Sequence, residues 1–292
     1  MTLLILVTLL WAFSFSLIGV YLAGEVDSYF SVLTRVLLAT AVFLPLLNWR
    51  TPPRTALSLM AIGAVQLGAM YLFYYQSFLL LSVPEVLLFT IFTPVYITLI
   101  DDLLKRHFSW WNLLVAAIAV FGAAVIRWDE LSGSYWRGFL VVQGANLCFA
   151  SGQVAYRQFM QSAGYREHPL PQRQVFGWFF VGASLVVSIA WLALGQADYP
   201  KTPIQWGILL WLGAVASGLG YFLWNKGATQ VSAGTLAAMN NALIPAGLLV
   251  NLLIWNRDAH LPRLLAGGLL IVAAVALSEW HSRQRQRQHR RN

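Results

Sequence analysis

The chain contains ten apolar stretches, each about as long as a membrane-spanning helix. They cover approximately residues 2–23, 28–48, 55–81, 84–104, 110–126, 138–160, 175–195, 204–228, 233–255 and 261–280. A helix needs about 20 mostly apolar residues to cross a hydrocarbon core of ~30 Å. With a mean hydropathy of +0.65 and only 10% charged residues, the chain has more apolar residues than a soluble domain can bury. The sequence therefore predicts an all-α membrane protein with ten transmembrane helices.

One predicted hairpin occurs twice in the chain. Residues 71–94 read YLFYYQSFLLLSVPEVLLFTIFTP, and residues 221–245 read YFLWNKGATQVSAGTLAAMNNALIP. Both begin with an aromatic stripe and end at a proline inside the second helix. Because five helices per copy is an odd number, the second copy must cross the membrane in the opposite direction. The pattern predicts two inverted five-helix repeats around a central cavity, at 1–136 and 137–280, followed by a basic tail at 281–292.

The distribution of basic residues predicts the orientation of the chain. With ten spans, both termini lie on one side, where the loops hold eight Lys and Arg residues against five in the opposite loops. Five more arginines lie in the last twelve residues. Since Lys and Arg favour cytoplasmic loops, both termini are expected in the cytoplasm, with the protein in a bacterial inner membrane. The tail is interpreted as a topology signal or a contact with anionic lipid, not as a nucleic-acid-binding arm.

Pro94 and Pro245 interrupt two predicted helices. A proline has no N–H to donate, so the carbonyls of Thr90 and Asn241 lose their helical partners. An unpaired carbonyl in hydrocarbon costs several kcal/mol and must face protein or water. The polar side chains beside the two breaks are Thr90, Thr93, Asn240 and Asn241. They predict a polar floor on each side of a cavity; the alternative is that they only repair the breaks or join helices.

An aromatic stripe precedes each break. Its residues recur at i, i+3, i+4 and i+7, which places them on one helical face. The two stripes are Tyr71, Tyr74, Tyr75 and Phe78, and Tyr221, Trp224, Asn225 and Ala228. Such faces could stack on a flat ring or hold a cation, or they could form a packing seam. Polar residues of the first and sixth spans complete the predicted lining, with interhelical hydrogen bonding as the alternative: Trp11, Ser14, Gln143 and Asn146.

Four charged residues of the second and fourth predicted spans are candidates for a role in function or packing. Arg35 costs about 2.5 to 3.5 kcal/mol at a helix centre on insertion scales. It could bind a substrate carboxylate through its bidentate fork, or it could be structural, bonded to backbone carbonyls or snorkelling outwards. Glu85 lies in a first helical turn, where the helix dipole favours a carboxylate, and is also the candidate for proton coupling. Asp101 and Asp102 are expected to be surface charges, with Asp101 paired to Lys105 at i, i+4.

Several short motifs occur in a characteristic order. They are WAFSFSLIG from Trp11, Arg35 in LTRVLLATAVFLPLL, the prolines Pro94 and Pro245, and the glycines Gly122 and Gly267. In these features, over essentially its whole length, the chain resembles the drug/metabolite transporter superfamily of the EamA type. The resemblance implies two inverted five-helix repeats, a cavity bounded by helices one, three, four, six, eight and nine, and transport, often export, of small metabolites. Since helix two is peripheral in that arrangement, we expect Arg35 to be structural.

These features predict a secondary transporter that exports small metabolites, such as amino acids or aromatic and amphiphilic compounds, by alternating access. Its energy source would be the substrate gradient or protons. One alternative is uptake or exchange of an anionic metabolite bound by Arg35, and another is a membrane enzyme or sensor scaffold. The sequence has no HExxH, Gly-rich phosphate loop or GxSxG, and no histidine in a predicted span, so we expect no enzyme, cofactor or metal site. We expect a monomer, with a dimer as the alternative.

Overall fold

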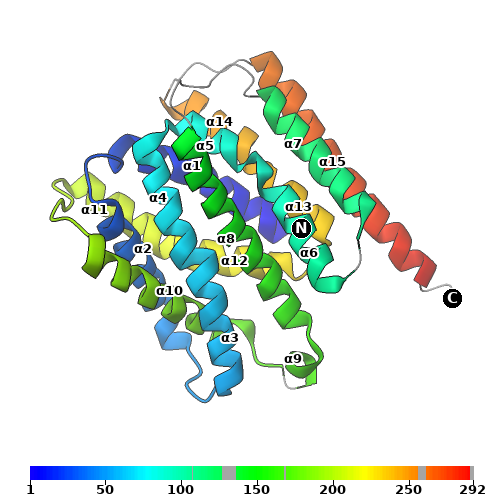
Figure 1. The fold of residues 1–292 in the computed structure, drawn as a ribbon, viewed down its shortest axis with the longest axis horizontal. Helices are drawn as coiled ribbons and strands as arrows, with labels where there is room; N and C mark the ends of the chain where they lie inside the picture. Colours follow the sequence, from blue (N-terminus) through cyan, green and yellow to red (C-terminus); the bar gives the residue numbers. More distant parts are fainter. Residues whose placement is uncertain (107, 127–135, 168, 256–260, 290–292) are drawn as a thin grey trace.

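The computed structural model describes residues 1–106, 108–126, 136–167, 169–255 and 261–289, and every regular element in these ranges is a helix (Figure 1). Seven of the described helices are long and apolar enough to cross a membrane, and two shorter apolar helices cover residues 110–122 and 265–281. A further long helix, α8 (Trp136–Gln161), is more polar because it carries several amide side chains. The prediction of an all-α membrane protein is confirmed.

The helices follow the order of the predicted spans. They are α1 (Thr2–Tyr21), α2 (Ser28–Phe43), α3 and α4 (Pro53–Gly63 and Met70–Leu80), α5 and α6 (Val83–Phe89 and Thr93–Lys105), α7 (Trp110–Ile126), α8, α10 (Gln172–Leu194), α11 and α12 (Pro203–Leu210 and Gly220–Ala228), α13 and α14 (Ala233–Asn241 and Leu243–Trp255) and α15 (Leu261–His289). A short α9 (Ala163–Glu167) lies in the connection between α8 and α10. Helix α15 runs to His289 instead of ending at 280, because the Arg and Gln residues after Trp280 are good helix formers.

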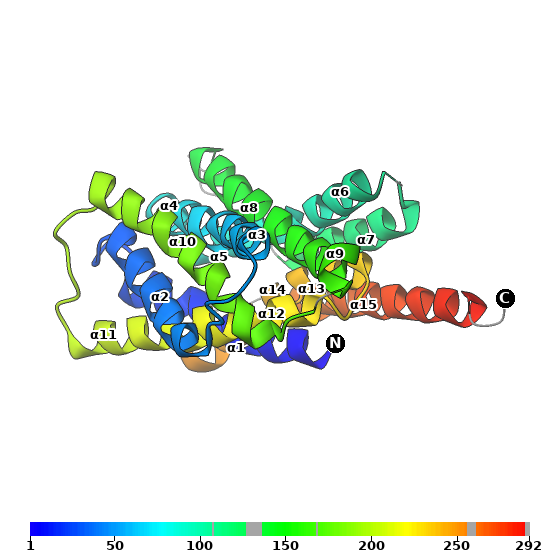
Figure 2. The same ribbon diagram turned by 90° about the horizontal axis from the view of Figure 1, so that it is seen from below.

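Connections far apart in sequence are joined at both ends of the molecule. At one end, the Asp27 N–H donates to the Asp198 carbonyl at 2.7 Å, which links the connection before α2 to the connection before α11. At the opposite end, Gln161 Nε2 donates to the Thr229 carbonyl at 3.3 Å. We call this second end the terminal end, because the chain termini lie towards it in both views (Figures 1 and 2). It is the end predicted to face the cytoplasm.

Two spans contain a π-helical segment at matching positions. The first, η2 (Ala64–Ala69), lies between α3 and α4, and the second, η4 (Trp211–Leu219), lies between α11 and α12. Gly-Ala-Val occurs at 63–65 and again at 213–215, so the two segments share a local sequence. The extra residue of a π-segment shifts the helical register, and such segments are frequent at functional sites.

Glycine residues of these two spans bring helix backbones into direct contact. A Cβ atom on Gly63 of α3 would overlap the Phe179 carbonyl of α10. In the second copy, a Cβ atom on Gly213 would lie 2.7 Å from Leu38 Cβ and 3.2 Å from Arg35 Cα, both on α2. Small residues allow this close approach between membrane helices. The η4–α2 contact therefore sets Arg35 directly against the second half of the chain.

We expect Gly63→Ala to destabilise the protein by about 1 to 3 kcal/mol, because the methyl group must push α3 away from α10. Gly207→Ala is the matched control, since no atom lies within 4 Å of its added Cβ and alanine favours a helix. The measurement is thermal unfolding of the purified protein in detergent. Equal melting temperatures for the two variants would contradict the close α3–α10 contact.

Candidate functional site

A cavity lies between helices of both halves. Ten of the residues singled out from the sequence line it: Trp11, Ser14, Arg35, Tyr71, Tyr74, Thr90, Thr93, Asn146, Tyr221 and Asn240. The sequence patterns did not predict the apolar part of the lining, which is Phe15, Ile18, Met70, Ala145, Phe149 and Leu243. On α1, the helical spacing is a signal for Phe15 and Ile18. Residues 11, 14, 15 and 18 fall at i, i+3, i+4 and i+7, so both share one face with Trp11 and Ser14.

Five other residues singled out from the sequence lie behind this lining: Tyr75, Gln143, Trp224, Asn225 and Asn241. Each has a polar group that bonds to another residue of the chain, whereas the Oδ1 atoms of Asn225 and Asn241 are buried without a partner among the described residues. Trp224 Nε1 donates to Gln153 Oε1 at 2.9 Å, and Asn225 Nδ2 donates to the Tyr221 carbonyl at 3.0 Å. In the structure, these residues support the residues that face the cavity.

Arg35 faces the cavity from α2 and is only 2% exposed. Its Nη2 donates to the Tyr71 hydroxyl at 2.6 Å and its Nη1 to the Tyr75 hydroxyl at 2.9 Å. Its Nε donates to Ser217 Oγ of η4 at 3.2 Å. The expectation that Arg35 bonds to backbone carbonyls or snorkels outwards is wrong, because three hydroxyl groups are placed within its reach.

The guanidinium of Arg35 has no ion-pair partner among the described residues. Its three hydrogen-bond acceptors are neutral hydroxyls, and its carbon Cζ lies 4.3 Å from the ring centroid of Tyr71, close enough for a cation–π contact. Buried charges are ordinarily paired, because taking an isolated charge out of water is expensive. One wall of the cavity therefore carries a positive charge without a counter-ion. A guanidinium in this position suits a carboxylate, which it can bind through two parallel hydrogen bonds.

The two aromatic stripes meet in the structure. The rings of Tyr71 and Tyr221 lie 5.8 Å apart, edge to face. Trp11 adds contacts from α1, with its ring 5.1 Å from that of Tyr221 and 5.0 Å from that of Trp224. These are the separations at which aromatic pairs attract one another. The stripes are thus both a packing seam and part of a cavity wall.

The break before Pro94 is repaired by the backbone and by side chains. Residues Thr90–Phe92 form a single 3₁₀ turn, η3, and the Thr90 carbonyl accepts from both the N–H and, at 2.8 Å, the hydroxyl of Thr93. The Phe89 carbonyl accepts from Asn146 Nδ2 at 2.8 Å and from Gln143 Nε2 at 3.1 Å. Helix α8 therefore supplies amide donors to the interrupted span. Thr90, Thr93 and Asn146 have both predicted roles, because they take part in repairing the break and also face the cavity.

Asn240 and Asn241 are positioned by bonds to three helical segments. Asn240 Oδ1 accepts from Gln153 Nε2 at 3.3 Å, and Asn240 Nδ2 donates to the Leu236 carbonyl at 2.8 Å. Asn241 Nδ2 donates to the Ile91 carbonyl of η3 at 3.1 Å. The two interrupted spans are therefore bonded to each other near their breaks.

Glu85 lies outside this lining and caps α5. Its Oε2 accepts from both the backbone N–H and the hydroxyl of Ser82, each at 2.8 Å. This resembles half of a capping box, in which the third helical residue bonds back to the N-cap. The side chain is 5% exposed.

Comparison with known proteins places the chain in a family. The model of the EamA-like transporter family matches residues 1–128 and 136–279. The chain belongs to the EamA-like transporter family. It is therefore a membrane transporter, and the predicted superfamily is confirmed. A solved crystal structure shares its fold, with a TM-score of 0.77 at 17% identity, covering 95% of this chain and 96% of the other.

Two similar proteins are named for their substrate. The probable biotin transporter of Pseudomonas aeruginosa is 56% identical over 276 residues, which are 93% of this chain and 95% of the relative. The biotin transporter of Escherichia coli (strain K12) is 52% identical over 278 residues, which are 94% of this chain and 91% of the relative. These names support neither amino acids as the substrate nor export as the direction.

Proposed function

We propose that this chain transports biotin across the bacterial inner membrane and that Arg35 binds the carboxylate of the substrate. The observation that carries this proposal is the buried guanidinium of Arg35, which faces the cavity without a counter-ion. Biotin has one carboxylate at the end of a flexible aliphatic chain. Relatives more than 50% identical to this chain are named biotin transporters.

The other end of biotin suits the remaining walls of the cavity. Its fused bicyclic ring is compact and has a large apolar surface, which matches the aromatic side chains of Phe149, Tyr74 and Trp11. Its urea group has two N–H donors and one carbonyl acceptor. The hydroxyls of Thr90 and Thr93 and the amides of Asn146 and Asn240 offer groups of both kinds. Pockets of this type combine apolar walls with a few polar groups that fix the orientation of the ligand.

This proposal keeps part of the function predicted from the sequence. Transport of an anionic metabolite that binds to Arg35 was an alternative predicted from the sequence, and it becomes the main hypothesis. The prediction of a small amphiphilic substrate is kept. Without an ATP-binding loop, the driving force is the substrate gradient or a coupled ion, and Glu85 remains a candidate proton carrier. Interrupted helices at the cavity are typical of secondary transporters that alternate access around a central site.

We expect Arg35→Gln to weaken biotin binding by roughly 10- to 100-fold, because charge-assisted hydrogen bonds contribute about 1.5 to 3 kcal/mol. The affinity of purified protein for biotin and for its uncharged amide, biotinamide, is the measurement. The amide should bind wild type and Arg35→Gln equally. Arg54→Gln, an exposed position at the start of α3, is the control variant. If the variant loses the same factor for biotin and biotinamide, Arg35 is not the carboxylate site.

Phe149→Leu tests the aromatic wall independently of the charge. We expect a roughly two- to tenfold loss of affinity, because an aromatic contact contributes about 0.5 to 1.5 kcal/mol beyond its buried area. The loss should be the same for biotin and biotinamide, since the ring contact does not involve the carboxylate. Phe121→Leu, at an exposed position on α7, is the control. Unchanged affinity in Phe149→Leu would remove this wall from the proposed site.

A further inference from the structure

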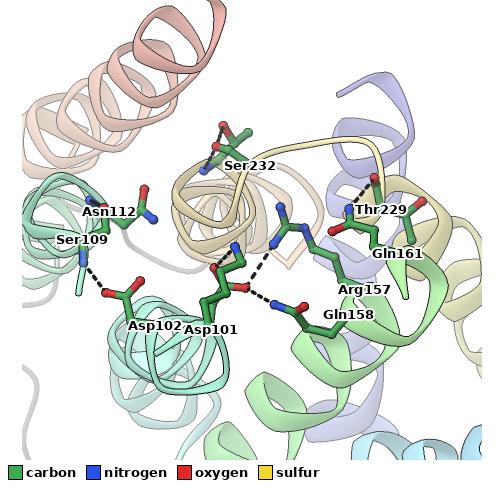
Figure 3. Close-up of polar contacts among 11 residues, drawn as sticks. Asp101, Asp102, Ser109, Asn112, Arg157, Gln158, Gln161, Thr229 and Ser232 are labelled. Carbon is green, nitrogen blue, oxygen red and sulfur yellow. Dashed lines mark hydrogen bonds and ion pairs between the residues drawn. The ribbon is translucent and has the colours of Figure 1, made fainter. Parts of the chain in front are cut away.

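A buried ion pair joins the two halves of the chain between the cavity and the terminal end. Asp101 of α6 is fully buried and Asp102 is 7% exposed, so the expectation of surface charges is wrong for both residues. Its Oδ1 accepts from Arg157 Nη1 at 3.1 Å and from Gln158 Nε2 at 3.0 Å, both on α8 (Figure 3). Its Oδ2 accepts from Lys105 Nζ at 2.6 Å, the i, i+4 contact predicted from the sequence.

The position of this pair follows from the two helices that carry it. The same interrupted span and the same α8 line the cavity, through Thr93 and Phe149. Asp101 lies eight residues after Thr93, and Arg157 lies eight residues after Phe149. At 1.5 Å per residue, both charges are about 12 Å further along their helices towards the terminal end. A solute that leaves the cavity between these helices must pass the ion pair.

At the other end of the molecule, the described residues of the counterpart helices form no equivalent charge pair. If the halves are inverted repeats, the counterparts of α6 and α8 are α14 and α1, which also pack against each other. The sequences of α1 and α14 contain no Asp, Glu, Lys or Arg. The contact between α6 and α8 therefore includes a buried ion pair, whereas its counterpart is made by helices without charged residues.

The hydrogen bonding of this buried pair is incomplete, which suits a contact that must open. Arg157 Nε is buried and has no hydrogen-bond partner in the described part of the chain. Both charges lose hydration when α6 and α8 close, and they regain it when water enters between the helices. The cost of this dehydration largely offsets the electrostatic attraction that favours closure. An apolar contact in the same place would favour the closed state, because opening it would expose apolar surface to water.

We propose that the Asp101–Arg157 ion pair is the gate at the terminal end, closed in this structure and opened by separation of α6 from α8. The proposal rests on transport through the cavity, but not on biotin as the substrate. The gate predicts that loss of either charge shifts the protein towards a state in which the cavity is open at this end.

Labelling of a cavity cysteine tests the gate. Cys148, the single native cysteine, is first replaced by alanine, and Ser14→Cys then places a thiol in the cavity. A membrane-impermeant maleimide is applied to vesicles of each orientation. Cysteines at the exposed positions Ser162 and Gln196 identify the terminal end and the opposite end, respectively. No biotin is present, so failure of the substrate assignment does not affect the result.

Asp101→Asn and Arg157→Gln should each increase the labelling rate from the terminal end about tenfold, with no increase from the opposite end. Lys105→Gln is the matched control, with less than a twofold change, because the Lys105 side chain is 43% exposed and exposed pairs contribute little. Unchanged rates in folded single variants, or equal increases from both ends, would overturn the gate.

A second variant keeps the test decisive if the single variants do not fold. Asp101→Leu combined with Arg157→Met replaces the ion pair by an apolar contact, a change that buried ion pairs often tolerate. The gate predicts that its labelling rate from the terminal end falls several-fold below that of the parent. A rate equal to or above the parental rate would overturn the proposal.

Discussion

The Arg35 side chain is a permanent charge held out of water by three neutral hydroxyl groups and an aromatic ring. These partners accept from three of its five N–H groups but do not neutralise it. Tyr71 and Tyr75 come from α4, and Ser217 comes from η4 in the other half of the chain. The guanidinium thus connects three spans and at the same time gives the cavity a positive wall. An anionic substrate would neutralise that charge, which is why the cavity favours a carboxylate.

Backbone contacts at glycine make this arrangement possible. Gly213 brings η4 against α2 next to Arg35, and Ser217 lies four residues further along the same π-segment. The corresponding Gly63 packs against α10 at Phe179, where the second half has an aromatic residue instead of an arginine. The two halves therefore share their packing but differ in charge. This difference places the positive charge on one side of the cavity only.

The sequence predicted the helices, the interrupted spans and the polar residues of the cavity, because hydropathy, proline and amide side chains in a membrane are strong signals. It did not predict Phe149, since an apolar residue that faces a cavity looks like one that faces lipid; Phe15 and Ile18 were missed although their spacing puts them on one face with Trp11 and Ser14. The family resemblance placed Arg35 in a peripheral helix, and no local sequence pattern shows which hydroxyls a neighbouring span brings within reach. Asp101 was misread for a similar reason: Lys105 offered a local partner, and the distant Arg157 gave no sequence signal.

The most direct test of the central claim is an experimental structure of the protein with biotin bound. The account predicts the biotin carboxylate within about 3 Å of the guanidinium nitrogens of Arg35, the usual length of a charge-assisted hydrogen bond. The bicyclic ring should lie against Phe149 and Tyr74, with the urea group near Thr90, Thr93 and Asn146. A carboxylate bound elsewhere, with Arg35 still bonded only to Tyr71, Tyr75 and Ser217, would contradict it.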